Sequence, residues 1–491
     1  MAAASTTRPT LTKVKAEEDL QPLKVLLQEA GLDDIGLDEE KEPELVATLW
    51  KGAGQALRVQ DMILKVIRQE ARLSMSQAES YRAELAFYVH GFAARARQGG
   101  APVPRGYVFG EVAEEDEDGG GKKSKGKKKK KKKKKTKAKR KRGGAKANPR
   151  LPILGDGARF FSLMTDMTSE FPESTIDFSK EQAVAALKWI ARFHATFMGT
   201  VGEAVSSHGA SVCERDHSRA LRGLWSRGCF WNLYRSREQF RDVERTYARE
   251  VSARLAKEYP ELLRERPGIA LLAQRLKAAG EVLDRRLLAS SPGNSAAWFT
   301  ILHGDLKGAN FALKKREGDE GEWEAGVFDF QWSGAGLGAR GEFSLRYFIL
   351  LSFFRRRSLV ISSALPDIAY FVISCALPVY VETAEAEDEL LRVYFKERQS
   401  RARQRPNVKK SKGDGKGKGG GGGGGGGEMN FQQFRLLYDV AFCDFMRWLL
   451  GYGLWGGPLE AWSLARADDI LARADRHGVG EVVDYEEAFR G

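Results

Sequence analysis

Two short stretches of the chain decide how the rest of it is interpreted. Residues 301–310 read ILHGDLKGAN, and residues 327–331 read VFDFQ. Apolar text flanks the first stretch, so Asp305 and Asn310 are expected on a loop between two strands, and Asp329 is expected where a third strand ends. Phosphoryl transfer needs a carboxylate that orients the accepting hydroxyl and oxygen ligands that hold Mg²⁺ against the phosphates. The alternative is a strand-end turn whose polar groups cap neighbouring backbone.

A lysine and a glutamate occupy apolar contexts nearer the N-terminus. Lys65 lies inside the apolar run 62–67, and Glu84 falls on the inward face predicted for a helix over 76–89. A charged side chain is costly to bury unless it is paired. A pair would explain both positions, with Lys65 holding the α- and β-phosphates of a nucleotide and Glu84 positioning Lys65. The alternative is an edge-strand lysine that points to water.

The predicted elements are rich in strands first and in helices second. Strands are expected at 45–50, 56–59, 62–67, 103–111, 160–166, 298–302, 311–315 and 326–330, and helices at 20–30, 76–89, 180–198, over most of 215–290 and over most of the remainder. Ser76 with Glu79, and Ser179 with Gln182, are the capping boxes predicted for two of the helices. This order predicts an α+β fold with two lobes and a cleft.

Charge and low complexity mark the predicted domain organisation. Residues 1–43 form a charged leader, 44–170 a small strand-rich N-lobe and 171–491 a larger helical C-lobe. Two insertions of biased composition, at about 112–150 and 401–427, are expected to be disordered because they cannot bury apolar surface. Within the first, the run from Lys122 to Arg142 contains 17 Lys and Arg and no acidic residue, so leaving out this run changes the net charge from +14 to −3.

The basic charge is thus confined to one low-complexity segment. A nucleic-acid-binding domain would spread it over a folded face, so nucleic acid is not the expected partner. A spacer, a nuclear address and an acidic-surface contact remain alternatives for the poly-Lys run.

Cysteine usage and hydropathy indicate a reduced, cytoplasmic compartment. The four cysteines form no CxxC pair, and the apolar region 343–381 is interrupted by charges and prolines, so no membrane span is expected. The first sixteen residues contain no acid, which leaves an organelle transit peptide as an alternative.

On the residues just quoted, the chain resembles the aminoglycoside phosphotransferase and choline kinase group, and most closely its ecdysteroid-kinase-like (CHK kinase-like) family, over roughly residues 44 to 480. The resemblance implies a protein-kinase-like fold and an ATP- and Mg²⁺-dependent kinase that phosphorylates a hydroxyl or amine of a small molecule. It implies that Asp305 is the catalytic base, that His303 braces the loop, that Asn310 is a metal ligand and that Asp329 is the principal one.

The resemblance extends to the nucleotide. Gly52 and Gly54, in the run Lys51-Gly52-Ala53-Gly54, are candidates to cover the phosphates with their backbone N–H groups, although an ordinary hairpin turn explains them as well. Residues 161–166 would line the adenine side as the hinge, or form a core strand. The protein-kinase interpretation is weaker, because HGD replaces HRD and no DFG or APE motif follows.

One segment departs from the family pattern. Relatives have a helix-starting Asp almost directly after a GLG turn, whereas here residues 340–366 separate Gly338 from Asp367. This segment is either a genuine insertion or a gene-model error such as a retained intron. Because it falls beside the predicted metal site, a catalytically impaired pseudokinase or ATP-binding module is the alternative function.

Overall fold

The computed structural model describes residues 43–49, 54–68, 75–111, 158–198, 221–225, 228–231, 237–277, 300–318, 321–335, 365–376, 378–404, 430–453 and 459–476. The chain divides into two compact units, of which the first comprises 1–74 with 106–165 and the second comprises 75–105 with 166–491. The predicted leader before residue 43, its helix at 20–30, the insertion at 112–150, Gly52, residues 340–364 and residues 405–427 lie outside the described residues. The predicted lobe boundaries stay predictions.

The first unit is a five-stranded antiparallel sheet. Its strands are β1 (Glu44–Thr48), β2 (Gly54–Val59), β3 (Met62–Arg68), β4 (Gly106–Glu111) and β5 (Ala158–Thr165), in the spatial order β1-β2-β3-β5-β4. Val59, Met62, Leu64 and Leu163 form a buried cluster on one face, because alternate residues of paired strands point the same way. The predicted pairing of the segments 103–111 and 160–166 is confirmed.

Lys65 lies on the central strand of this sheet. It pairs with Ala56 of β2 on one side and with Ser162 of β5 on the other, and it is partly buried. The alternative interpretation of Lys65 as an edge-strand lysine is therefore wrong. Gly54 is a strand residue at the start of β2, where an added Cβ would lie 2.1 Å from the carbonyl oxygen of Val66. This close approach explains the need for glycine at position 54 without a ligand.

The second unit is mainly helical and holds two small hairpin-like pairings. Its helices are α2 (Met75–Val89), α3 (Phe92–Gln98), α4 (Met167–Glu170), α5 (Lys180–Phe197), α7 (Arg237–Thr246), η5 (Tyr247–Val251), α8 (Ser252–Glu258), α9 (Pro260–Glu265), η6 (Pro267–Leu271), η8 (Gly308–Asn310), α11 (Leu365–Cys375), η10 (Pro378–Tyr380), α12 (Ala384–Arg403), α13 (Phe431–Tyr452) and α14 (Glu460–Arg476). β6 (Ile301–Leu302) pairs with β9 (Gly334–Ala335), and β7 (Phe311–Lys315) pairs with β8 (Trp323–Val327).

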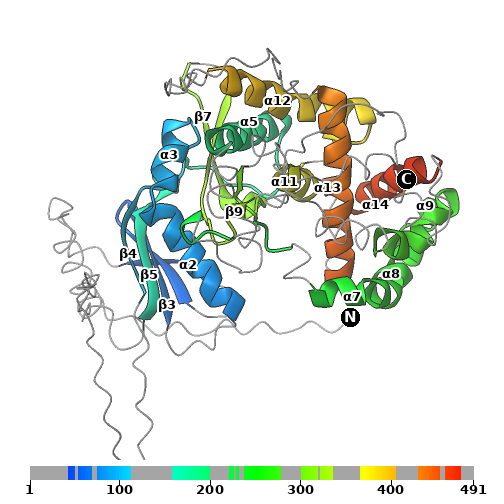
Figure 1. Cartoon of the computed structure of the whole chain (residues 1–491), viewed down its shortest axis with the longest axis horizontal. Coiled ribbons are helices and arrows are strands. Elements are labelled where there is room, and N and C mark those ends of the chain that lie inside the picture. The colour runs from blue at the N-terminus through cyan, green and yellow to red at the C-terminus, as the bar shows by residue number, and fades with distance from the viewer. Residues whose placement is uncertain are drawn as a thin grey trace, which may run out of the picture. The chain divides into compact units, whose positions relative to one another are not determined.

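Helix α11 is the interior helix of this unit. Almost all of its residues are buried, and it packs against α13 and α5, while α5 packs against α12 (Figure 1). A helix that is apolar all round belongs in a core, which explains the absence of an exposed face. The few polar side chains on α11 must therefore find partners inside the protein.

Several predicted boundaries differ from those observed. Helix α2 begins at Met75, so Ser76 is a helical residue and not the cap that was predicted. β4 begins at Gly106 and not at Val103, because the carbonyls of Pro102 and Pro104 are used by other elements. β8 covers 323–327 and not 326–330, and α12 continues through Arg403 into the predicted spacer.

The predicted start of α5 is confirmed at the level of individual atoms. The Ser179 hydroxyl accepts a hydrogen bond from the Gln182 N–H at 3.3 Å, and the Gln182 side-chain oxygen accepts one from the Ser179 N–H at 2.9 Å. Two N–H groups that the helix leaves without partners are thereby satisfied. Across the described ranges, no helix is both long enough and apolar enough to cross a membrane.

We expect Ser179→Ala to lower the free energy of unfolding by about 1 kcal/mol, because the Gln182 N–H loses its acceptor. Urea denaturation of the full chain measures this. Ser169→Ala, at an exposed serine of α4, is the matched control and should change stability by less than about 0.5 kcal/mol. Equal losses in the two variants would show that the capping box does not stabilise α5.

Candidate functional site

Residues 303–310 form a loop between β6 and β7, as predicted, and their backbone is tightly confined. Gly304 has a φ of 86°, and a Cβ at this position would lie 2.3 Å from the carbonyl oxygen of Trp332. The Gly304 carbonyl accepts a hydrogen bond from the Phe230 N–H at 3.4 Å. Only glycine fits both this backbone conformation and this close approach, which is why the motif reads HGD here.

The Asp367 carboxylate holds the loop from α11. Its Oδ2 accepts the His303 backbone N–H at 2.7 Å, and its Oδ1 accepts the Gly304 N–H at 2.9 Å. Asp367 is fully buried, so these two bonds are shielded from water. The sequence placed Asp367 only at the start of a helix. Its role could have been suspected from a carboxylate in an otherwise apolar helix.

His194 also donates a hydrogen bond to the Asp367 carboxylate. Its Nε2 lies 3.1 Å from Asp367 Oδ2, and its Nδ1 lies 3.1 Å from the Tyr394 hydroxyl on α12. Because the carboxylate only accepts, the Nε2 carries the proton and the Tyr394 hydroxyl donates to Nδ1. Burial lowers the pKa of His194, against the opposing effect of Asp367, so the ring stays neutral. His194 is thus a hydrogen-bonded histidine of the core.

His303 joins the loop to the segment that carries Asp329. Its Nδ1 accepts the Asp305 N–H at 3.3 Å, and its Nε2 donates to the Phe328 carbonyl at 3.0 Å. Burial lowers the pKa of His303, against the attraction of Asp367 and Asp305, and this agrees with a neutral ring. These contacts are the geometry expected of a brace, and they make His303 a positioning group rather than an acid or base.

Asp305 is buried, with donors around both carboxylate oxygens. Oδ1 accepts the Tyr370 hydroxyl at 3.0 Å, while Oδ2 accepts Lys307 Nζ at 2.8 Å and Asn310 Nδ2 at 3.3 Å. The Asn310 amide also donates to the Asp305 carbonyl at 2.7 Å.

Asp329 lies next to Asn310 through the backbone. The Phe328 N–H donates to the Asn310 carbonyl at 3.1 Å, directly before Asp329. Asp329 has a φ of 70°, which is an unfavourable conformation for a residue other than glycine. This conformation ends β8 at Val327 and explains the boundary difference noted above. A strained residue of this kind is typical of functional sites and supports a role for the Asp329 side chain.

Lys307 is a site residue that the sequence interpretation missed. Burial lowers its pKa, but the attraction of Asp305 and Asp329 outweighs burial and raises the pKa overall. Lys307 is therefore a stable cation, paired with Asp305 at 2.8 Å, and its side chain is 45% exposed. Lys307 could have been found from the sequence, because it is the only cationic residue between Asp305 and Asn310 in the motif.

The other predicted nucleotide-binding residues fall in two units. Glu84 is buried on α2 in the second unit, whereas Lys65 and Gly54 belong to the sheet of the first. The Lys65–Glu84 pair stays a prediction. Glu84 and Asp329 both add to the effect of burial in raising the pKa of Tyr88, so the two carboxylates lie near the same hydroxyl. Trp225 and Trp231 are fully buried, so they pack in the core of the second unit.

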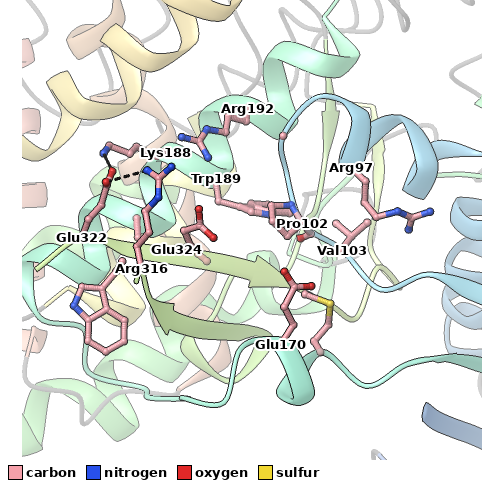
Figure 2. A pocket seen from close by; sticks show the side chains of 15 residues that line it. Arg97, Pro102, Val103, Glu170, Lys188, Trp189, Arg192, Arg316, Glu322 and Glu324 are labelled. Carbon is pink, nitrogen blue, oxygen red and sulfur yellow. Dashed lines mark hydrogen bonds and ion pairs between the residues drawn. The ribbon is translucent and has the colours of Figure 1, made fainter. Parts of the chain in front are cut away.

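A cavity of about 380 Å³ lies in the second unit between α3, α5 and the β7–β8 hairpin (Figure 2). Lys188 and Arg316 both point to Glu322, at 3.3 and 3.1 Å. Charges of opposite sign on its wall thus compensate one another, and they do not select a class of ligand. The candidate active site is the loop cluster of Asp305, Asn310 and Asp329.

No protein-family model matches the chain, and no curated protein matches its sequence. Several solved structures are similar to this chain. A choline/ethanolamine kinase family protein from Mesorhizobium loti is 14% identical, with 96% of this chain and 98% of that chain covered and a TM-score of 0.33. A microcompartment-associated aminopropanol kinase is 13% identical, with 95% and 98% covered and a TM-score of 0.37. Similarities this weak do not support a conclusion about function. Such a conclusion has to come from the geometry of the site.

Replacing the anchor should loosen the loop. In Asp367→Asn, one carboxylate oxygen is replaced by an NH₂ group, which cannot accept a hydrogen bond from the loop N–H that it faces. We therefore expect the free energy of unfolding to fall by about 2 to 3 kcal/mol. Chemical denaturation measures the loss. Asp242→Asn, which removes a surface ion pair with Arg245, should cost less than about 1 kcal/mol. An Asp367→Asn variant as stable as this control would contradict the anchoring role.

The buried neutral His194 predicts a pH dependence of stability. Its ordinary pKa is 6.5 and its folded pKa is lower, so the unfolded chain binds the proton first as the pH falls. The His194 contribution is therefore complete above pH 6.5 and is lost as the pH falls towards the folded pKa. We expect His194→Asn to flatten the decline in free energy of unfolding between about pH 7.5 and about pH 5. His90→Asn, at an exposed histidine, should leave the decline as steep as in the parent chain.

Proposed function

We propose that this protein is an ATP-dependent phosphotransferase that phosphorylates a hydroxyl or amine of a small-molecule acceptor. The observation that carries the proposal is the cluster of Asp305, Asn310 and Asp329. The Asn310 side-chain amide donates a hydrogen bond to the Asp305 carbonyl. The Asn310 carbonyl accepts one from the N–H of Phe328, the residue before Asp329. A buried carboxylate beside two further hard-oxygen side chains is what phosphoryl transfer requires of a protein.

Asp305 is the base in this proposal. The acceptor O–H donates to the Asp305 carboxylate, the acceptor oxygen forms a bond to the γ-phosphorus of ATP, and the bond from that phosphorus to the β–γ bridging oxygen breaks. The acceptor proton passes to Asp305, and ADP leaves with the electron pair of the broken bond. Lys307 is hydrogen-bonded to Asp305, where a cation would offset the charge of the transferring phosphate oxygens.

Asn310 and Asp329 are the residues that would hold Mg²⁺. The fit rests on the chemistry of the donors, since an amide oxygen and a carboxylate are both hard ligands. Phosphate oxygens and water would complete the ligand set, as is usual for Mg²⁺. When bound, Mg²⁺ supplies charge neutralisation at the β- and γ-phosphates. Lys65 is proposed to hold the α- and β-phosphates, and Glu84 is proposed to position Lys65.

The direct test follows ATP consumption by the purified full chain against a collection of small alcohols and amines, with and without Mg²⁺. The proposal expects Mg²⁺-dependent ATP consumption that one acceptor class stimulates. Binding of Mg·ATP without phosphate transfer to any acceptor or to water would favour the pseudokinase alternative. Absence of both binding and transfer would overturn the proposal and its alternative together.

The two aspartates should fail differently. Asp305→Asn keeps the shape and removes the base, so Mg·ATP affinity should stay within about twofold while turnover falls at least about 100-fold. Asp329→Asn removes a ligand charge, so Mg·ATP affinity itself should fall about tenfold and the Mg²⁺ requirement should rise. Asn310→Ala should resemble the Asp329 variant. Calorimetric titration with Mg·ATP and initial-rate kinetics separate these effects.

Asp61→Asn is the control, because Asp61 is exposed in the turn between β2 and β3. It should alter neither affinity nor turnover. The Asp305 and Asp329 losses should be non-additive in the double variant, since both residues serve one transition state. Near-normal turnover of Asp305→Asn on a confirmed acceptor would show that another group is the base.

A further inference from the structure

Tyr370 on α11 contacts Asp305, and this contact was not predicted from the sequence motif. Its hydroxyl lies 3.0 Å from Asp305 Oδ1, in a bond that is buried on both sides. Tyr370 follows Asp367 by three residues, so the two side chains lie on the same face of the helix. One turn of α11 therefore bonds both the loop backbone, through Asp367, and the base, through Tyr370.

The partners of Asp305 distinguish its two oxygens. An ionised carboxylate offers about two acceptor directions on each oxygen. Oδ2 receives both Lys307 and Asn310, so its two directions are occupied. Oδ1 receives Tyr370 alone among the residues that the structure describes, and one direction remains. Oδ1 is therefore the oxygen that can accept the proton of an incoming hydroxyl.

The Tyr370 ring is held in place by aromatic neighbours on two other segments. Its centroid lies 5.9 Å from that of Phe230 and 4.7 Å from that of Phe445 on α13. The tyrosine side chain is only 8% exposed, so the hydroxyl has little freedom to turn to water. Burial and then Asp305 raise the pKa of Tyr370 well above its ordinary value, so the hydroxyl keeps its proton and stays a donor.

We propose that Tyr370 is a positioning residue for phosphoryl transfer, and that its hydroxyl fixes the Asp305 carboxylate so that Oδ1 faces the acceptor. This inference rests on the proposed function. The Tyr370 proton does not move during the reaction. The acceptor proton passes to Oδ1 as the bond between the acceptor oxygen and the γ-phosphorus forms and the bond to the leaving ADP oxygen breaks. Without Tyr370, the carboxylate can rotate and place Oδ1 away from the acceptor.

The position of Tyr370 also bears on the segment 340–366. Whatever precedes it, the chain reaches α11 with Leu365 and Pro366 already buried in the helix, and Asp367 and Tyr370 follow in register with the loop. Asp367 and Tyr370 therefore both reach the loop from the helix that follows this segment.

The experiment compares Tyr370→Phe with the parent full chain, using Mg·ATP with water as the acceptor and then with the acceptor found in the screen. The ring packing is kept and one hydroxyl is lost. We expect kcat to fall about 10-fold to 100-fold, because a hydrogen bond to a charged group is lost. The Kd for Mg·ATP should change less than about twofold, and the melting temperature should stay close to that of the parent.

The matched control is Tyr438→Phe. Tyr438 is also fully buried, and its hydroxyl has no hydrogen-bond partner within the described residues, so the same atom is removed away from Asp305. This variant should keep the parental kcat. A loss of kcat equal to that in Tyr370→Phe would show that removing any buried tyrosine hydroxyl has the same effect, and it would overturn the assignment.

A double-mutant cycle tests whether Tyr370 acts through Asp305. If it does, adding Tyr370→Phe to Asp305→Asn should lower the residual rate less than about twofold. An independent, purely structural effect would lower that rate by the full single-variant factor and would overturn the inference. A parental chain that consumes no ATP with water or any acceptor overturns the proposed function and this inference together. An active parent with an unaffected Tyr370→Phe overturns this inference alone.

Discussion

The Asp367 carboxylate accepts the backbone N–H groups of His303 and Gly304 and faces the ring of His194, all inside the core of the second unit. A loop has no ladder of its own, so its buried amides need an acceptor from elsewhere. A backbone carbonyl would satisfy one N–H at a time, whereas a carboxylate satisfies several and adds charge. The loop therefore takes this conformation only when α11 packs against it and supplies the Asp367 carboxylate.

From this contact the remaining geometry follows in order. With the Gly304 amide fixed, His303 can accept from the Asp305 N–H and donate to the Phe328 carbonyl, which couples the loop to the strained conformation of Asp329. The Phe330 ring then lies against His303 at 4.7 Å and stacks on Phe87 of α2 at 3.8 Å. Neutral, buried histidines suit this role because they donate and accept in fixed directions at little electrostatic cost.

Much of this arrangement was accessible from local sequence. Apolar flanks placed Asp305 and Asn310 on one loop, and the order of strands and helices predicted a mixed α and β fold. The capping box at Ser179 located the start of α5 to the residue. The errors lie where distant residues decide the outcome. β4 starts late because the Pro102 carbonyl accepts hydrogen bonds from the Val327 N–H and the Trp189 side chain, and β8 ends early because Asp329 takes a positive φ.

The sequence by itself determined which chemical groups are present and their local order, because periodicity, capping and glycine requirements act over a few residues. It identified Asp305, Asn310 and Asp329 without identifying what holds them. Only the tertiary structure showed that Asp367 anchors the loop and that Lys65 is on a central strand. It also showed that Tyr370 and Lys307 donate hydrogen bonds to different oxygens of Asp305. Asp367 and Tyr370 lie more than sixty residues from the loop that they contact, and no local pattern encodes which buried donor meets which buried acceptor.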